Sequence, residues 1–347
     1  MLQIISMSKN KSASQPLLRK EFQLIQRYFS EHQQTTRSDL LLGIGDDCAI
    51  VAPRKQANVA FSIDTLISGV HFPDNTTADA IAYKALAVNL SDLAAMGAEP
   101  AWFTLALSLP DHHQWSEQHR NKWLKDFSKA LFSLAKEHNI QLIGGDTTAS
   151  PILSITIQVC GYLEKNTGLT RSGAQPDDII AVTGKLGGAS VGLDLLLETH
   201  NNAYNSLSEN DKQQAIHALN YPQARIQEGL YLKHIAHSAL DLSDGLLSDL
   251  GHILKASQVG AQLYLDKLPL ADALSCLSDE QAWNKALSGG DDYELCFTIA
   301  PRHWARVREK FPHCVAIGRV TKEETVQLIT PNSMNFKAQQ KGYDHFG

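Results

Sequence analysis

The sequence predicts a protein of two domains that mixes strands and helices, in the α/β or α+β class. Its length, 347 residues, is about that of two ordinary domains. Hydrophobic residues make up 43% and charged residues 20% of the chain, which is typical of a folded protein with a sizeable core. Both halves contain apolar runs typical of strands between segments of helical periodicity, with no sequence repeat at a fixed period.

We expect the first domain to span residues 21–165, after a loose, polar extension at residues 1–20. Thr76 and Thr77 are suitable N-caps for an apolar helix, and Gly97 suits its C-terminal end. The predicted helices are 21–29, 79–96 and 116–138, and the predicted strands are 58–63, 101–109, 140–143 and 152–162, with a strand pattern at 40–51 that glycines and aspartates interrupt.

The pattern relaxes near residues 164–168, so we expect the second domain to span residues 166–347. The polar residues 200–214 are predicted to form a connection without regular structure. The predicted strands are 178–183, 261–265, 295–299, 314–320 and 325–329, and the predicted helices are 225–237, 245–256, 279–287, 302–310 and one that ends near 198.

Composition excludes several classes of function. The net charge is −6 and no basic block is present, which argues against a nucleic-acid partner. The 5 cysteines are scattered, without a Cys-x-x-Cys pair, as expected for a reduced cytoplasmic protein without a disulfide framework or zinc site. No apolar run approaches the roughly 18 residues that cross a bilayer, so we expect a cytoplasmic protein with no membrane partner.

Aspartates beside glycines or at predicted strand ends are the strongest functional signal. Two acids that share a turn, such as Asp241 and Asp244, repel each other by several kcal/mol at an effective dielectric constant of about 20, and a cation relieves the repulsion. Asp92 lies within the apolar helix 79–96, where a carboxylate needs a proton, a partner or a metal ion. The remaining members of the set are Asp46, Asp47, Asp64, Asp146, Asp291 and Asp292.

Each of these aspartates alone is typical of a turn or helix cap, but the set predicts one Mg-nucleotide site. Hard oxygen ligands without His or Cys partners favour Mg²⁺, which also takes phosphate oxygens. No phosphate-loop motif is present, and Cys48 stands where the dinucleotide fingerprint needs a third glycine. Gly184–Gly188 before a helix is either an anion site or an ordinary turn, and Arg171 is either a phosphate clamp or a solvated loop residue.

Other chemistries are weakly supported. Ser243 has no Gly-x-Ser-x-Gly context, and the histidines lack the His-Glu-x-x-His spacing of zinc hydrolases. His71, beyond the strand that ends near Asp64, is either an exposed loop residue or a substrate contact.

The motifs taken in order resemble those of the bacterial thiamine-monophosphate kinases, over nearly the whole chain from Glu21 to Phe346. Each motif alone is weak, but their fixed order over the chain is highly specific. The motifs are Gly43–Ala49 (GIGDDCA), Ser62–Thr65 (SIDT), Lys84–Gly97 (KALAVNLSDLAAMG), Gly144–Thr147 (GGDT), Leu169–Gly173 (LTRSG), Asp241–Gly245 (DLSDG), Ser288–Leu295 (SGGDDYEL) and the ending Lys341–Phe346 (KGYDHF).

This resemblance implies a two-domain fold like that of the aminoimidazole ribonucleotide synthetase-like ATP-binding proteins. The N-terminal domain would pair with that of a second subunit in a dimeric β-barrel, so a homodimer is expected. The implied reaction is phosphorylation of thiamine monophosphate to thiamine diphosphate, the last step of thiamine diphosphate biosynthesis. ATP would be the phosphoryl donor, and several Mg²⁺ ions would lie between the domains.

The resemblance also implies roles for individual residues. Gly145, Asp146, Arg171 and Ser243 would meet the nucleotide, and His71, Asp291 and Tyr343 would contact thiamine monophosphate, with Tyr343 offering an aromatic face to the cationic rings. Asp92, Asp146 and Asp244 would be catalytic. The implied magnesium ligands are Asp47, Ser62, Ile63, Asp64, Asp92, Asp146, Asp241 and Asp244.

Two positions depart from the family pattern. Asp291 stands where the family usually has Glu, so its carboxylate is one methylene shorter and its direct reach to the substrate is in question. Ile63 stands where the family often has Thr and could ligate a metal ion only through its carbonyl. Two alternatives stay open at this point, another ATP-dependent synthetase of the same fold and a non-catalytic Mg-nucleotide sensor.

Overall fold

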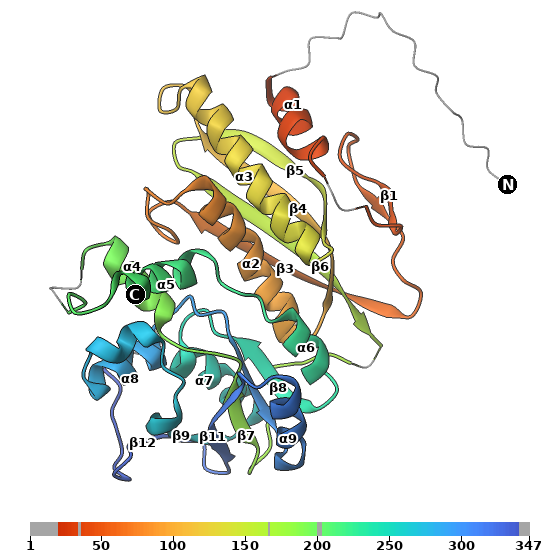
Figure 1. Cartoon of the computed structure of the whole chain (residues 1–347). Helices are drawn as coiled ribbons and strands as arrows, with labels where there is room; N and C mark the ends of the chain where they lie inside the picture. Colours follow the sequence, from red (N-terminus) through yellow and green to blue (C-terminus); the bar gives the residue numbers. More distant parts are fainter. Residues whose placement is uncertain (1–19, 34–35, 166, 200–202, 340–347) are drawn as a thin grey trace, which may run out of the picture.

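A four-stranded mixed sheet lies at the centre of the N-terminal half of the computed structural model, which describes residues 20–33, 36–165, 167–199 and 203–339 (Figure 1). β6 is antiparallel to both of its neighbours, whereas β4 and β5 are parallel. β3 and β5 are therefore the edge strands. The strand order is β3 (Ala57–Ile67), β6 (Ser154–Glu164), β4 (Glu99–Pro110) and β5 (Gln141–Ser150).

Two long helices, α2 (Ala78–Met96) and α3 (Glu117–Glu137), cover one face of this sheet (Figure 1). α2 ends at Gly97, whose φ of 67° closes the helix as the sequence predicts. Near the start of the chain, α1 (Lys20–Ile25) continues into a π-helical turn, η1 (Gln26–Ser30), and β1 (Leu40–Leu42) pairs with β2 (Ile50–Val51).

A six-stranded sheet forms the C-terminal half, in the order β12-β9-β11-β7-β10-β8. Its neighbours are antiparallel except for β9 and β12, so the molecule takes the α+β form of the predicted class. The strands are β7 (Ile179–Val182), β8 (Ala236–Asp241), β9 (Gly260–Tyr264), β10 (Leu295–Ile299), β11 (Val315–Thr321) and β12 (Val326–Ile329). The helices are α4 (Gly188–Leu196), α5 (Glu209–Asn220), α6 (Ile226–Leu232), α7 (Leu246–Ser257), α8 (Asp279–Ser288) and α9 (Pro301–Lys310), with short 3₁₀ turns η2 (Leu265–Lys267) and η3 (Asp272–Cys276).

α2 lies between the two halves and is buried on more than one side. It packs on the N-terminal sheet and also contacts α6 and β8. One core cluster therefore runs from Leu86 and Leu90 of α2 to Leu232 of α6 and Ala239 of β8. This double burial explains why the helix has no polar face, and it makes any charged residue on α2 costly unless that residue is paired.

Several predicted boundaries are wrong. β3 and β5 continue past Asp64 and Asp146, so these acids lie within strands and not at strand ends. Part of the polar stretch 200–214 belongs to α5, which Ser208 caps by accepting a hydrogen bond from the N–H of Asp211. The helix predicted at 225–237 ends at Leu232, because the following residues enter the sheet as β8.

The N-terminal sheet is open in the single chain, with β3 and β5 at its two edges. In the described part of the chain, none of the helices has the length and apolar character needed to span a membrane.

Candidate active site in the cleft between the two halves

A cavity of about 740 Å³ opens between the two halves of the molecule. From the N-terminal half, β3, α2 and the turn at 69–75 line it. From the C-terminal half, α4, the turn after β8 and the loop 290–293 line it. The cavity collects four acids from three places in the sequence, which are Asp64, Asp92, and Asp241 with Asp244. We call these four residues the cleft acids.

Three separate elements position the cleft acids. Asp64 lies within β3, and Asp92 lies on the last turns of α2. Two residues before Asp64 on β3, the hydroxyl of Ser62 donates a hydrogen bond to Oδ2 of Asp92. Asp241 is the last residue of β8, and Asp244 follows it in the turn before α7. The fold therefore brings acids that are far apart in the sequence into one cleft.

The turn from Asp241 to α7 is held as one unit. Oδ2 of Asp249 accepts hydrogen bonds from the N–H groups of Asp244 at 3.0 Å and Gly245 at 3.1 Å. Gly245 has a φ of +113°, and a Cβ at this position would lie 2.8 Å from the backbone of Ser288. Only glycine fits both constraints. This local packing fixes the backbone that presents Asp241 and Asp244 to the cleft.

Crowding of the cleft acids disfavours their charged forms. Burial raises the pKa of Asp64 to about 6, and the neighbouring Asp92 adds to the shift. Burial, followed by the charge of Asp92, raises the pKa of Asp241 to about 7. Burial also raises the pKa of Asp92, although the hydrogen bond from Ser62 and the charge of Arg171 oppose that shift. A cation bound in the cleft would favour the charged forms of these carboxyl groups.

The other end of the cavity combines a few polar groups with an apolar wall. His71 accepts a hydrogen bond from the N–H of Ile67 through Nδ1 at 3.0 Å, so its neutral imidazole carries the proton on Nε2. Lys84 and Asp291 form an ion pair across the cleft, with 3.0 Å between Nζ and Oδ1. Leu193, Leu196, Leu197 and Val70 supply the apolar wall.

A second cavity, of about 730 Å³, holds the other predicted ligands. Asp47 and Asp146 line it, and both are exposed. We call these two residues the outer acids. Gly145 beside them has a φ of +154°, and a Cβ there would lie 1.9 Å from the carbonyl oxygen of Leu105. The glycine is therefore required for the close approach of β5 to β4.

The cleft acids and the outer acids lie toward opposite edges of the N-terminal sheet. Asp64 of β3 pairs with Ile157, Ile157 pairs with Leu105, and Leu105 pairs with Gly145 of β5. Three inter-strand spacings of about 4.8 Å place Gly145 about 14 Å from Asp64 across the sheet. Asp146, the next residue on β5, therefore does not join the cleft acids within one chain.

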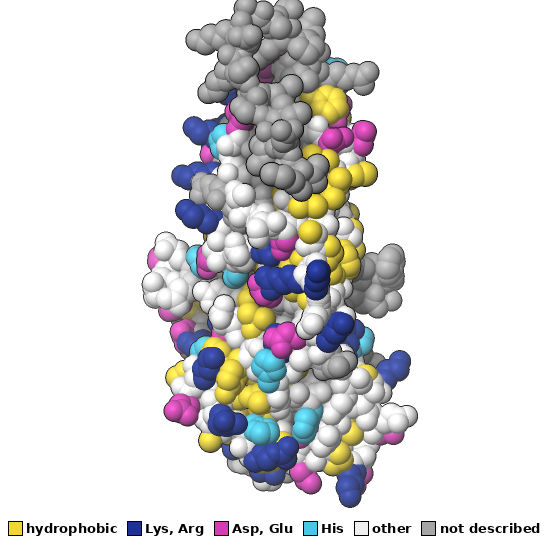
Figure 2. Space-filling view, turned by 90° about the vertical axis from the view of Figure 1, so that its right-hand side faces the viewer, with side chains coloured by type: hydrophobic (Ala, Val, Ile, Leu, Met, Phe, Trp, Pro, Cys, Tyr) yellow, Lys and Arg dark blue, Asp and Glu magenta, His cyan; other side chains and the backbone are white. Residues whose placement is uncertain are grey.

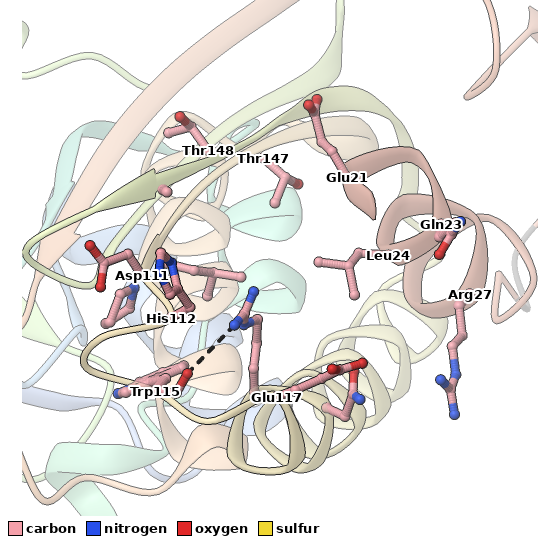
Figure 3. A pocket seen from close by; sticks show the side chains of 15 residues that line it. Glu21, Gln23, Leu24, Arg27, Asp111, His112, Trp115, Glu117, Thr147 and Thr148 are labelled. Carbon is pink, nitrogen blue, oxygen red and sulfur yellow. Dashed lines mark hydrogen bonds between the residues drawn. The ribbon is translucent and has the colours of Figure 1, made fainter. Parts of the chain in front are cut away.

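A third cavity, of about 600 Å³, lies between α1, the start of α3 and the ends of β4 and β5 (Figure 3). Arg120 lines it and donates a hydrogen bond to the carbonyl of Trp115 at 3.5 Å. The wall carries both signs of charge, with Glu21 and Asp111 as well as Arg27. Among the described residues, none of the predicted site residues lines this cavity, so it is separate from the candidate active site.

The donor set of the cleft fits Mg²⁺ bound together with phosphate. Within the described residues, no three His, Cys, Asp or Glu side chains are placed to hold one metal ion, so no complete cage is preformed. Mg²⁺ usually takes one or two carboxylates and completes its octahedron with waters and phosphate oxygens. Asp64 and Asp92 are close enough that the charge of Asp92 raises the pKa of Asp64. A cation bound between the two carboxylates would relieve this repulsion.

The structure distributes the predicted site residues between the two cavities. Ser243, His71 and Asp291 line the cleft with the cleft acids, and Arg171 is near enough to Asp92 to affect its pKa. The side chain of Ile63 is 60% exposed. Tyr343 lies outside the described residues.

Lys84 and Tyr293 are among the residues that line the cleft but were not predicted from the sequence. The argument applied to Asp92, a charge within an apolar helix, would have identified Lys84 as well. Tyr293 had no comparable signal, because an aromatic residue before a strand is usually part of the core.

Comparisons with known proteins match both halves of the chain. The family model described as AIR synthase related protein, N-terminal domain, matches residues 45–163, and the corresponding C-terminal domain model matches residues 175–330. Thiamine-monophosphate kinase of Escherichia coli (strain K12) is 46% identical over 335 residues, which cover 94% of this chain and 98% of the relative.

Solved structures resemble the chain over most of its length. The crystal structure of thiamine-monophosphate kinase from Stenotrophomonas maltophilia K279a has a TM-score of 0.76 and 44% identity, covering 84% of this chain and 92% of that chain. The structure described as "AaThiL complexed with AMPPCP and TMP" has a TM-score of 0.73 and 26% identity, covering 94% of this chain and 96% of that chain.

Proposed function

Because the chain belongs to the AIR synthase related protein family, and within it to the thiamine-monophosphate kinases, we propose that it phosphorylates thiamine monophosphate with ATP. The product is thiamine diphosphate. A relative was solved with AMPPCP and TMP together, which supports binding of a nucleotide and the acceptor by one protein. We place the boundary between the two domains at residue 166, between the two stretches that the family models match.

The observation that carries this proposal is the polarity of the cleft. The cleft acids occupy one end, and the other end has the His71 imidazole, the Lys84–Asp291 pair and a leucine wall. Thiamine monophosphate suits these two ends, because Mg²⁺ held by the cleft acids would bind its anionic phosphate, and its aromatic rings, one of them cationic, fit the apolar wall and the carboxylate of Asp291. We place its phosphate toward the cleft acids and its rings toward α4.

The cleft acids are the residues that would hold Mg²⁺, which when bound neutralises the charge of the reacting phosphates. Ser62 orients Asp92 through its hydrogen bond, and Asp249 fixes the turn that carries Asp244. Arg171, beside Asp92, is available to a phosphate of the nucleotide. These residues position charge and do not act as acid or base.

The transfer proceeds in line and directly. An oxygen of the acceptor phosphate forms a bond to the γ-phosphorus of ATP, and the bond from that phosphorus to the ADP oxygen breaks. The acceptor oxygen is already anionic, so no general base is needed. This explains a site rich in aspartate and poor in histidine. Exchange of label between ATP and ADP without thiamine monophosphate would show a phosphoenzyme and would contradict direct transfer.

Turnover by the purified protein tests the function. With ATP, Mg²⁺ and thiamine monophosphate, we expect ADP and thiamine diphosphate to form in equal amounts. A synthetase of the same fold would release ADP only with an amide or selenide acceptor. A non-catalytic sensor would bind ATP without releasing ADP. Absence of both products with thiamine monophosphate would reject the kinase.

We also propose a homodimer that forms through the open side of the N-terminal sheet. Phe61 and Ile63 of the edge strand β3 are 65% and 60% exposed, and Leu41 and Ile50 are 66% and 51% exposed. Figure 2, which faces the right-hand side of Figure 1, shows hydrophobic side chains gathered on the upper part of this face. An edge strand with exposed apolar side chains is an unusual feature for a monomer.

A second copy would also complete the site. If β5 of one copy lies along β3 of the other, the two sheets close into the predicted barrel, and Asp146 of each copy approaches the cleft acids of the other. Two inactive variants, Asp92→Asn and Asp146→Asn, test this arrangement when they are mixed and allowed to exchange subunits. Each mixed dimer would then contain one intact site, so about a quarter of the full activity should return. No recovery after proven exchange would contradict a shared site.

A further inference from the structure

Lys84 is an unusual residue for its place in the fold. It lies on α2, the helix that is buried between the two halves, and it is 3% exposed. A lysine at such a position is stable as a cation only with close partners. Its Nζ contacts Oδ1 of Asp291 at 3.0 Å and donates a hydrogen bond to the carbonyl of His71 at 3.3 Å. One buried cation therefore joins α2 to two loops of the cleft.

The loop that carries Asp291 is constrained on its backbone as well. Asp291 has a φ of +67° and Tyr293 a φ of +50°, a strained conformation for residues with side chains. Their N–H groups donate hydrogen bonds to the carbonyls of Ser243 at 2.9 Å and Leu242 at 2.8 Å. The loop is thus tied to the turn of the cleft acids, and Lys84 fixes the direction of the Asp291 carboxylate.

We propose that Lys84 is a positioning residue for the phosphoryl acceptor, acting through Asp291 and the His71 loop. This inference rests on the proposed function, because it assigns the acceptor to this end of the cleft. Lys84 holds Oδ1 of Asp291, and Asp291 lines the cavity, where its carboxylate would meet the cationic ring of the acceptor. The aspartate is shorter than the glutamate usual in the family, so a fixed direction matters more for its reach.

The role predicts a specific kinetic signature. Loss of the Lys84 charge should weaken binding of the acceptor and leave binding of the nucleotide unchanged. For Lys84→Met, which keeps the apolar stem, we expect the KM for thiamine monophosphate to rise about tenfold. The KM for ATP should change by less than about twofold, and kcat by less than about threefold. Lys84→Arg, which keeps the charge, should recover much of the acceptor affinity.

A double variant separates positioning through Asp291 from direct contact with the substrate. If Lys84 acts through Asp291, the two substitutions should not add. The KM for thiamine monophosphate of the double variant, Lys84→Met with Asp291→Asn, should then be no higher than that of the more damaging single variant. The positioning role would be overturned if the KM increases of the two single variants multiplied in the double variant. A loss of kcat with an unchanged KM for thiamine monophosphate would also overturn it. Lys122→Met is the control, because Lys122 pairs with Asp126 on the surface of α3 at 2.9 Å, and it should leave all constants unchanged.

Further measurements keep the test decisive. Thermal melting shows whether Lys84→Met is folded, and if it is not, Asp291→Asn alone should show the same rise in the KM for thiamine monophosphate. A wild-type protein without turnover would reject the proposed function. Calorimetric titration of thiamine monophosphate into wild type, Lys84→Arg and Lys84→Met would then test the inference without turnover. We expect weaker binding to Lys84→Met than to the other two proteins. Equal affinities, or no binding to any of them, would overturn the inference.

Discussion

The cleft acids and the outer acids are the same residue type, yet the fold gives them opposite environments. Asp64, Asp92 and Asp241 are partly buried and crowded, and burial raises the pKa of each. Asp47 and Asp146 are exposed and line the second cavity. Crowded acids need a cation to remain charged, whereas exposed acids can stay charged without one.

This difference gives the two groups of acids different roles. The cleft acids already lie close together in one chain, so they need only a cation and phosphates to form a site. Asp146 follows Gly145, which lies about 14 Å from Asp64 across the sheet, so the outer acids need a second surface to complete a site. The proposed dimer supplies that surface.

The largest expected effect is the loss of turnover when a cleft acid is neutralised. Asp92 contacts both Ser62 and Asp64, so Asp92→Asn removes the charge at the centre of the cleft. We expect kcat to fall by about a thousandfold or more, because electrostatic stabilisation of the transferring group is lost. The protein should remain folded, since the change also relieves a buried repulsion. Steady-state kinetics and thermal melting measure the two quantities.

A matched control for this change is Asp126→Asn on α3. Asp126 forms an exposed ion pair with Lys122 at 2.9 Å, so its loss should leave turnover unchanged and alter stability by less than about 0.5 kcal/mol. An unfolded Asp92→Asn protein would mean that Asp92 is structural, and the comparison between the two groups of acids would fail.

The second largest expected effect is weaker dimerisation when the exposed apolar surface of β3 is changed. Phe61→Ser removes an aromatic side chain that is 65% exposed on β3. Losing the burial of one such side chain should weaken the dimer about thirtyfold or more. Turnover should then depend on protein concentration and recover when the protein is concentrated. Sedimentation and activity measured over the same concentrations test both expectations.

Ile152→Ser is the control for the dimer surface. Ile152 is also exposed, at 53%, but it lies in the turn between β5 and β6 and not on the open edge of β3. It should leave the association state unchanged. A wild-type protein that sediments as a monomer at every concentration would contradict the shared site.

The sequence predicts the strongly periodic elements of this fold well. The helices expected at 79–96 and 116–138 are observed at Ala78–Met96 and Glu117–Glu137, because apolar spacing and caps define them. α5 was missed because only Ala215 and Leu219 of this polar helix are buried. β5 was predicted to end before Gly144 because two glycines usually end a strand. The contact of Gly145 with Leu105 is a tertiary feature that the sequence does not display.

The candidate site is also only partly predictable from the sequence. The repeated aspartates indicate which residue types bind the ligand, and they were enough for the Mg-nucleotide hypothesis. Their division into cleft acids and outer acids depends on the strand order β3-β6-β4-β5, which places Asp64 and Asp146 on the two edge strands. Strand order is set by long-range packing, so no local pattern predicts it.

The smallest expected effect is on stability, and it distinguishes the two groups by pH. The folded-state pKa values of Asp64, about 6, and Asp241, about 7, lie above the ordinary value of 3.8. The folded protein therefore binds these protons more tightly than the unfolded chain does. Their contribution to stability is complete below about pH 4 and is lost as the pH rises through 6 to 7.

Mg²⁺ should reverse this loss. Without divalent metal, in the presence of a chelator, we expect the free energy of unfolding to fall between pH 5 and pH 8 as Asp64 and Asp241 lose their protons. Mg²⁺ should raise the melting temperature at pH 8 and have less effect at pH 5, where Asp64 and Asp241 keep their protons. In Asp92→Asn the pH difference should shrink, because the neighbour that raises both pKa values is gone, whereas in Asp146→Asn it should persist. A Mg²⁺ effect of equal size at both pH values would mean that the outer acids, and not the cleft acids, bind the ion.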